Sequence, residues 1–280
     1  MKPSMNCRCC SMGHDLLEIL VYILAFLAGA LAGEAVHIVT WDFLMEKKAL
    51  MLPPECICGS TGSRIYIHPG ILRLFVHKEV CPVCNRMRPL DVFATEVVLG
   101  LGFAYLIYRY GFRFELFAAF SLLCLLTFAF RAGVAKAFVP NSLILWFLGL
   151  GLIVSILNEI LPISFLVDQT WWNQPVAALG TGVFLLLMSF LGSFISRKEM
   201  AIGPGDIKLF MVTAFCIGWR LAVFAVSIAV FLAGMAGAVL LIAGIRERED
   251  TLPFSPFIAV GAALSIFFWQ ELIFWFTGMA

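Results

Sequence analysis

Charge is scarce in this chain, and its two signs nearly cancel. Only 13% of the 280 residues are charged, with 19 Lys and Arg against 18 Asp and Glu, so the net charge is +1. A chain this close to neutral lacks the strongly basic surface on which general nucleic-acid binding depends. It also lacks the polar side chains that a soluble domain needs on its surface, because 62% of the residues are hydrophobic.

Two further features are missing. The sequence has no low-complexity segment, and it shows no repeat with a period of about 20 to 50 residues. The first apolar run, residues 16–44, is too long for the apolar region of a secretory signal peptide and has no small-residue cleavage site behind it. We therefore expect this run to be a retained membrane span.

Long apolar runs dominate what is present. A helix needs about 20 apolar residues to cross the hydrocarbon core of a bilayer. By this criterion the chain is predicted to be an all-α polytopic membrane protein with about eight transmembrane helices and a small cytoplasmic insert that contains cysteines. The expected spans are residues 16–44, 94–111, 114–130, 141–162, 174–196, 207–219, 220–245 and 256–277.

The expected organisation is a single membrane domain interrupted by one insert. Residues 1–44 would form an N-terminal tail and the first helix, residues 45–93 the insert, and residues 94–280 the remaining seven helices. With the insert on the cytoplasmic side, 14 Lys and Arg residues fall on that side and 5 outside. This bias predicts that both termini lie outside, because loops rich in Lys and Arg stay in the cytoplasm.

One polar segment lies between two apolar runs, at Gly203-Pro204-Gly205-Asp206-Ile207-Lys208-Leu209. An ionisable group in this setting predicts a functional site, because an unpaired charge is costly in hydrocarbon. The 14 residues from Asp206 to Arg220 span about 21 Å of helix, less than the ~30 Å hydrocarbon core, which places Asp206 in a cytoplasmic recess. Gly203 and Gly205 would let another backbone come close. The simpler interpretation is that Asp206 caps its helix or pairs with Lys208.

Two cysteine pairs lie in the insert. Cys81 and Cys84 have the C-x-x-C spacing of a zinc half-site, whereas Cys56 and Cys58 have a single residue between them. Together these four thiolates predict a structural zinc site. The alternative is that they are free thiols, kept reduced in the cytosol.

In the first span, Glu34 and His37 are one helical turn apart. We interpret them as a satisfied polar pair, with a proton relay as the alternative.

The polar segment resembles the Gly-x-Gly-Asp-hydrophobic-Lys-Leu signature of type IV prepilin peptidases, which are polytopic aspartic proteases of the bacterial inner membrane. Val139-Pro140-Asn141-Ser142-Leu143 is similar to the Ile-Pro-Asn-x-Leu turn of that family. Pro253-Phe254-Ser255-Pro256-Phe257 is similar to its Pro-Phe-Gly-Pro-Phe start of the last span. The resemblance covers nearly the whole chain, except that the family's Gly-Ser-Phe-Leu-Asn stretch has no clear counterpart in the first span.

The resemblance implies a second catalytic aspartate seven residues before Pro140, where this chain has Gly133. Residues 116–158 contain no Asp or Glu at all. Three interpretations are open: a sequence altered to inactivate the protein, a natural pseudoenzyme, or a substitute acid among Glu115, Glu159 and Asp168. The third is disfavoured because these acids fall towards the outer face in the expected topology. We favour a member of an active family that lacks half of its carboxyl pair.

The resemblance also implies the reaction. The protein would cleave leader peptides of type IV prepilins or type II secretion pseudopilins at the cytoplasmic face, with Asp206 and an aspartate expected at position 133 activating water and Lys208 orienting the loop. Many family members methylate the new N-terminus with S-adenosylmethionine and carry paired C-x-x-C motifs. The alternatives are a non-catalytic prepilin-binding protein and, less favoured, a transporter. Lipid is the remaining expected partner, and nucleic acid is not expected.

Overall fold

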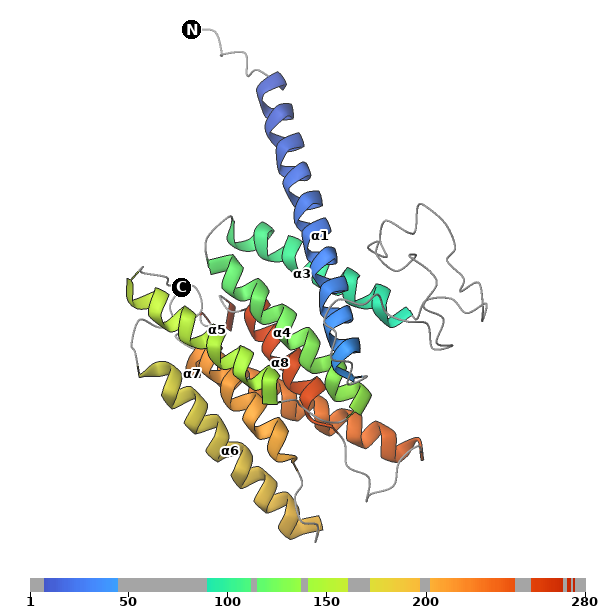
Figure 1. Cartoon of the computed structure of the whole chain (residues 1–280), viewed down its shortest axis with the longest axis vertical. Helices are drawn as coiled ribbons and strands as arrows, with labels where there is room; N and C mark the ends of the chain where they lie inside the picture. Colours follow the sequence, from blue (N-terminus) through green and yellow to red (C-terminus); the bar gives the residue numbers. More distant parts are fainter. Residues whose placement is uncertain are drawn as a thin grey trace. The chain divides into compact units, whose positions relative to one another are not determined.

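The computed structural model describes residues 8–44, 90–111, 115–136, 141–160, 172–196, 202–244, 253–268, 271–272 and 274 (Figure 1). These residues contain seven helices and no strand, which confirms the predicted all-α class. The helices are α1 (Arg8–Leu44), α3 (Leu90–Tyr110), α4 (Glu115–Lys136), α5 (Asn141–Ile160), α6 (Asn173–Ser196), α7 (Pro204–Ile242) and α8 (Ser255–Phe267). The predicted insert, including its four cysteines, lies outside the described residues apart from its last few positions.

Four helices contain segments long and apolar enough to cross a membrane. These segments are Leu17–Thr40, Leu116–Ala135, Asn173–Phe194 and Pro204–Ile242, and two shorter apolar helices cover Asn141–Leu157 and Ser255–Phe267. The chain is therefore built as a multi-pass membrane protein. α8 is shorter than the span expected at 256–277, because Phe268 leaves helical geometry with φ −109° and ψ 25°.

The chain divides into two compact units. The first, residues 1–42 and 47–116, holds α1 and α3. Glycines let these two helices approach closely: a Cβ added at Gly29 would lie 2.5 Å from the carbonyl oxygen of Leu99, and one at Gly33 would lie 2.8 Å from Cα of Glu96. Gly29 and Gly33 are four residues apart and therefore share one face of α1, as in the small-residue contacts common between membrane helices.

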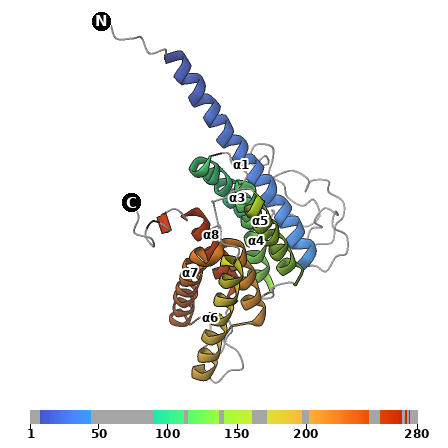
Figure 2. The same cartoon turned by 90° about the vertical axis from the view of Figure 1, so that its left-hand side faces the viewer.

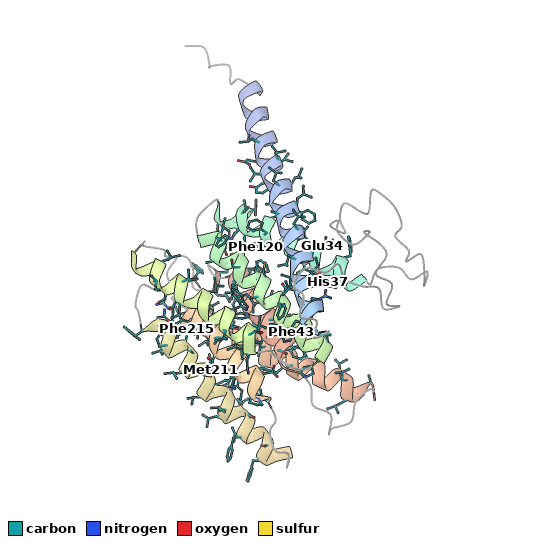
Figure 3. The ribbon with its side chains drawn as sticks, viewed as in Figure 1. Glu34, His37, Phe43, Phe120, Met211 and Phe215 are labelled. Atoms are coloured by element: carbon teal, nitrogen blue, oxygen red, sulfur yellow. The ribbon has the colours of Figure 1, made fainter. Side chains whose placement is uncertain are left out.

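The second unit, residues 43–46 and 117–280, is organised around α7. α7 packs against α5, α6 and α8, and it runs beside α6 in both views (Figure 1, Figure 2). On its α6 side, Met211 fills the space over Gly182, where an added Cβ would come within 2.8 Å of the Met211 sulfur (Figure 3). On its α5 side, Phe215 fills the space over Gly151 in the same way (Figure 3). Small residues on the neighbouring helices thus accept the large side chains of α7.

α7 is broken at Gly218. Its 39 residues would span about 58 Å as a straight helix, roughly twice the hydrocarbon thickness. Gly218 has φ 77° and ψ 169°, a conformation that glycine adopts without the strain other residues incur. The N–H of Trp219, released from the helix by the break, donates to Oδ1 of the buried Asn173 at 2.9 Å. The break falls within two residues of the boundary that the sequence predicts between the sixth and seventh spans.

Candidate functional site

Asp206 lies in the first turn of α7. Gly203 is the N-cap of this helix, with extended backbone at φ −63° and ψ 141°, and Pro204 follows it at the first helical position. Proline suits this position because its fixed φ fits the helix and the N–H it lacks would have no helical partner. The carbonyl of Gly203 accepts hydrogen bonds from the N–H groups of Asp206 at 3.1 Å and Ile207 at 3.2 Å. The turn therefore places a carboxylate at the positive end of the helix dipole.

The carboxylate of Asp206 is held by a second helix terminus. Oδ2 accepts a hydrogen bond of 3.1 Å from the backbone N–H of Phe254, which is the N-cap of α8. The bond joins two segments 48 residues apart, and α7 has no side-chain cap of its own. The described contact of Asp206 is thus with the start of α8, and the side chain of Lys208 is exposed.

Gly133 lies on α4, buried against the same start of α8. A Cβ added there would collide with Oγ of Ser255 and would lie 3.0 Å from Cβ of Ser255 and 3.1 Å from Cδ of Pro256. Ser255 also lies beside the carboxyl of Asp206. The two positions that the resemblance pairs, 133 and 206, therefore meet the same residue of α8 from different helices.

Ser255 is the polar side chain at this meeting point. It is fully buried, and its hydroxyl has no hydrogen-bond partner of good geometry although the Asp206 carboxyl lies nearby. Sequence reasoning assigned no role to Ser255 or to the N–H of Phe254. The available signal was a serine in the Phe-Ser-Pro segment where the related pattern has glycine.

The remaining predicted site residues are placed as follows. A Cβ at Gly203 would lie 3.7 Å from Oδ2 of Asp206, an ordinary contact, and Gly205 is half-buried. Asn141 begins α5 and is exposed, whereas Pro140 lies outside the described residues, as do Cys56, Cys58, Cys81 and Cys84. In the described part of the chain, no group of three or more His, Cys, Asp or Glu side chains is arranged to hold a metal.

Of the three candidate substitute acids, Glu115 and Glu159 lie on described helices. Glu115 begins α4 and is 18 residues from Gly133, about 27 Å along the helix. Glu159 stands in the last turn of α5, and Asp168 lies outside the described residues. In the first unit, Glu34 and His37 both lie on α1 (Figure 3) and are both buried, and each interacts with another group; their pairing with one another stays a prediction.

An apolar groove of about 420 Å³ adjoins the start of α7. Val183, Leu186 and Phe190 of α6 line one side, and Pro204 and Ile207 of α7 line the other. The hydroxyl of Ser189 accepts a hydrogen bond of 3.2 Å from the N–H of Ile202 and so fixes the segment leading into Gly203. The site thus combines one half-buried carboxyl group with an open apolar surface on the same helical turn.

Comparisons with known proteins agree with the resemblance. Residues 119–242, which include Gly133 and Asp206, match the model of the Type IV leader peptidase family. A prepilin leader peptidase/N-methyltransferase of Bacillus subtilis is 25% identical over 210 residues, which cover 75% of this chain and 79% of that protein. One of Legionella pneumophila is 24% identical over 211 residues, covering 74% and 69%. One of Burkholderia pseudomallei strain 1026b is 32% identical over 155 residues, covering 54% and 46%. No solved structure matches the chain.

Proposed function

We propose that this chain, which belongs to the type IV prepilin peptidase family, is a leader peptidase of the aspartic type reduced to one of its two carboxyl groups. Its substrates would be the leader peptides of type IV prepilins or type II secretion pseudopilins, presented at the cytoplasmic face of a bacterial inner membrane. The observation that carries the proposal is the convergence of Asp206 and Gly133 on the start of α8.

The chemistry of a complete site follows from two adjacent carboxyl groups. One carboxylate takes a proton from water as the water oxygen attacks the scissile carbonyl carbon, and the other carboxyl donates a proton to the departing amine. The N–H of Phe254 would keep the Asp206 carboxylate oriented through both steps. With glycine at 133 one of the two proton-transfer groups is absent. General acid or base catalysis contributes about 10²- to 10⁴-fold, so we expect a loss of that order in this sequence.

The proposal also includes an N-methyltransferase activity and a structural zinc site, both of which were expected from the sequence. N-methylation of the new N-terminus would use S-adenosylmethionine, in keeping with the names of the relatives. A structural zinc would be held by Cys56, Cys58, Cys81 and Cys84, where it would stabilise a short insert that has little core of its own.

Cleavage of a purified prepilin in proteoliposomes tests the proposal. The unchanged chain should cleave slowly or not at all. Gly133→Asp should restore cleavage when it is made together with Ser255→Gly, and adding Asp206→Asn should abolish it again. Glu18→Gln is the control, since it removes an exposed carboxyl on α1 that belongs to no part of the proposed site. If the restored variant is folded and cleaves no faster than its Asp206→Asn version, the carboxyl-pair reaction is refuted.

A second candidate is a non-catalytic protein that binds prepilins. The packing of Ser255 against Gly133 favours it, because Oγ and Cβ of Ser255 occupy the space that a side chain at position 133 would enter. Capture of a prepilin by the unchanged chain, with its leader intact after prolonged incubation, would support this candidate. Removal of the leader by the unchanged chain would exclude it.

A further inference from the structure

The space beside Gly133 is filled by a side chain from another helix. The nearest atoms to an added Cβ are the Oγ and Cβ of Ser255, followed by Cδ of Pro256. Separations of this kind are shorter than the ~3.5 Å at which carbon atoms pack favourably. Rotation about the Cα–Cβ bond of Ser255 can move Oγ away, but its Cβ at 3.0 Å and Cδ of Pro256 at 3.1 Å remain, so a methyl group at position 133 still requires these neighbours to shift by a few tenths of an ångström.

Ser255 has little freedom to give way. It is fully buried in the first turn of α8, and the next residue, Pro256, is buried as well. The residue before it, Phe254, is fixed by the hydrogen bond from its N–H to Asp206. A shift of this turn that made room at position 133 would therefore also disturb the bond that holds the Asp206 carboxylate.

We propose that residues 133 and 255 form one steric unit, in which Ser255 occupies the side-chain space that an acid at position 133 requires. The unit accepts a side chain at one of the two positions and glycine at the other. It rests on packing alone, so it stands or falls independently of the proposed cleavage reaction. Restoring an aspartate at position 133 would then require removal of the Ser255 side chain as well.

The same steric unit also accounts for the group beside Asp206, which is the hydroxyl of Ser255. Ser255 places a hydroxyl, not a second carboxyl, beside Asp206. A serine hydroxyl keeps its proton at neutral pH, so it can donate or accept a hydrogen bond without serving as the second titrating group of an acid–base pair. Ser255 thus keeps the site polar while leaving Asp206 as its one carboxyl.

The sequence departs from the related pattern at both positions and in opposite directions. A side chain is lost at position 133, and one is gained at position 255, where the pattern Pro-Phe-Gly-Pro-Phe has glycine. The two departures are complementary in size, in keeping with the packing of Ser255 into the space beside Gly133.

Thermal unfolding of the purified protein in detergent tests the unit without any substrate. Gly133→Ala should lower the melting temperature by about 5 °C, since overpacking a buried contact destabilises the folded state. The loss should be smaller in the Ser255→Ala background and smallest in the Ser255→Gly background, because these remove first Oγ and then Cβ. Gly149→Ala is the control: it is a helical glycine on α5 with no atom within 4 Å of an added Cβ, and its melting temperature should not fall.

The outcomes separate this inference from the proposed function. An equal loss for Gly133→Ala in all three backgrounds, or no loss in any, overturns the steric unit. Graded rescue supports the unit even when no variant cleaves prepilin, and in that case the peptidase proposal alone fails. Conversely, a Gly133→Asp variant that is as stable as the unchanged chain and cleaves with Ser255 in place overturns the unit while supporting the peptidase.

Discussion

Gly261 offers the sharpest test of how α8 is seated on α7. A Cβ added at Gly261 would lie 2.5 Å from the carbonyl oxygen of Ala225 and 3.2 Å from the backbone nitrogen of Ala229. Both contacts are backbone atoms, which cannot rotate away as a side chain can. Relief to an ordinary contact would require the two helices to separate by about 1 Å. Gly261→Ala should therefore weaken the packing along the whole contact between α7 and α8.

Two opposing contributions set the change in stability that Gly261→Ala should cause. Overpacking a tight contact costs about 1–3 kcal/mol, and a gap of 0.5–1 Å forfeits a quarter to a half of each neighbouring dispersion contact. Replacing glycine by alanine within a helix returns about 0.5–1 kcal/mol. We expect a net loss of about 1–2 kcal/mol, which corresponds to a fall in melting temperature of roughly 2–8 °C.

The matched control is Gly237→Ala on α7, where an added Cβ meets no atom within 4 Å. It should raise the melting temperature slightly, because only the helix-propensity term applies there. Thermal unfolding of both variants in the same detergent makes the comparison. A rise for Gly261→Ala as large as that for Gly237→Ala would refute the close crossing of α7 and α8.

Three further predictions concern other parts of the chain. Asn173→Ala should cost about 1–3 kcal/mol, because it leaves the Trp219 N–H without its acceptor; denaturant titration measures the loss, and unchanged stability would contradict this hydrogen bond. Gly33→Ala should lower the melting temperature by several degrees, since its Cβ would meet the α3 backbone at 2.8 Å, and unchanged stability would contradict that contact. The purified protein should contain about one zinc per chain by elemental analysis, and Cys84→Ser should lose it. Cys124→Ser should keep its zinc, because Cys124 lies on α4 outside the insert. Equal zinc contents in the two variants would exclude the cysteine site.

The sequence alone predicted the all-α class and the approximate positions of the described helices, although α8 is shorter than the span expected there. Spans of about 20 apolar residues have one low-energy solution in a bilayer, because every backbone polar group must be satisfied within its own segment. For the same reason the start of α7 at Pro204 and its break at Gly218 lie within a few residues of the predicted boundaries. The carboxyl of Asp206 was identifiable as well, since a charged residue between apolar runs is rare and costly.

What meets that carboxyl was decided only by the tertiary structure. The N–H of Phe254 and the side chain of Ser255 come from a helix that begins some 48 residues after Asp206, and Gly133 comes from one that precedes it by more than 70. Hydropathy and spacing describe each helix separately. The contact between Gly133 on α4 and Ser255 on α8, beside Asp206 on α7, depends on how these three helices pack. The sequence therefore determined that Asp206 stands in a membrane site and that Gly133 departs from its expected partner. Only the fold decided that Ser255 packs into the space beside Gly133, because the packing of helices that are distant in sequence sets which side chains meet.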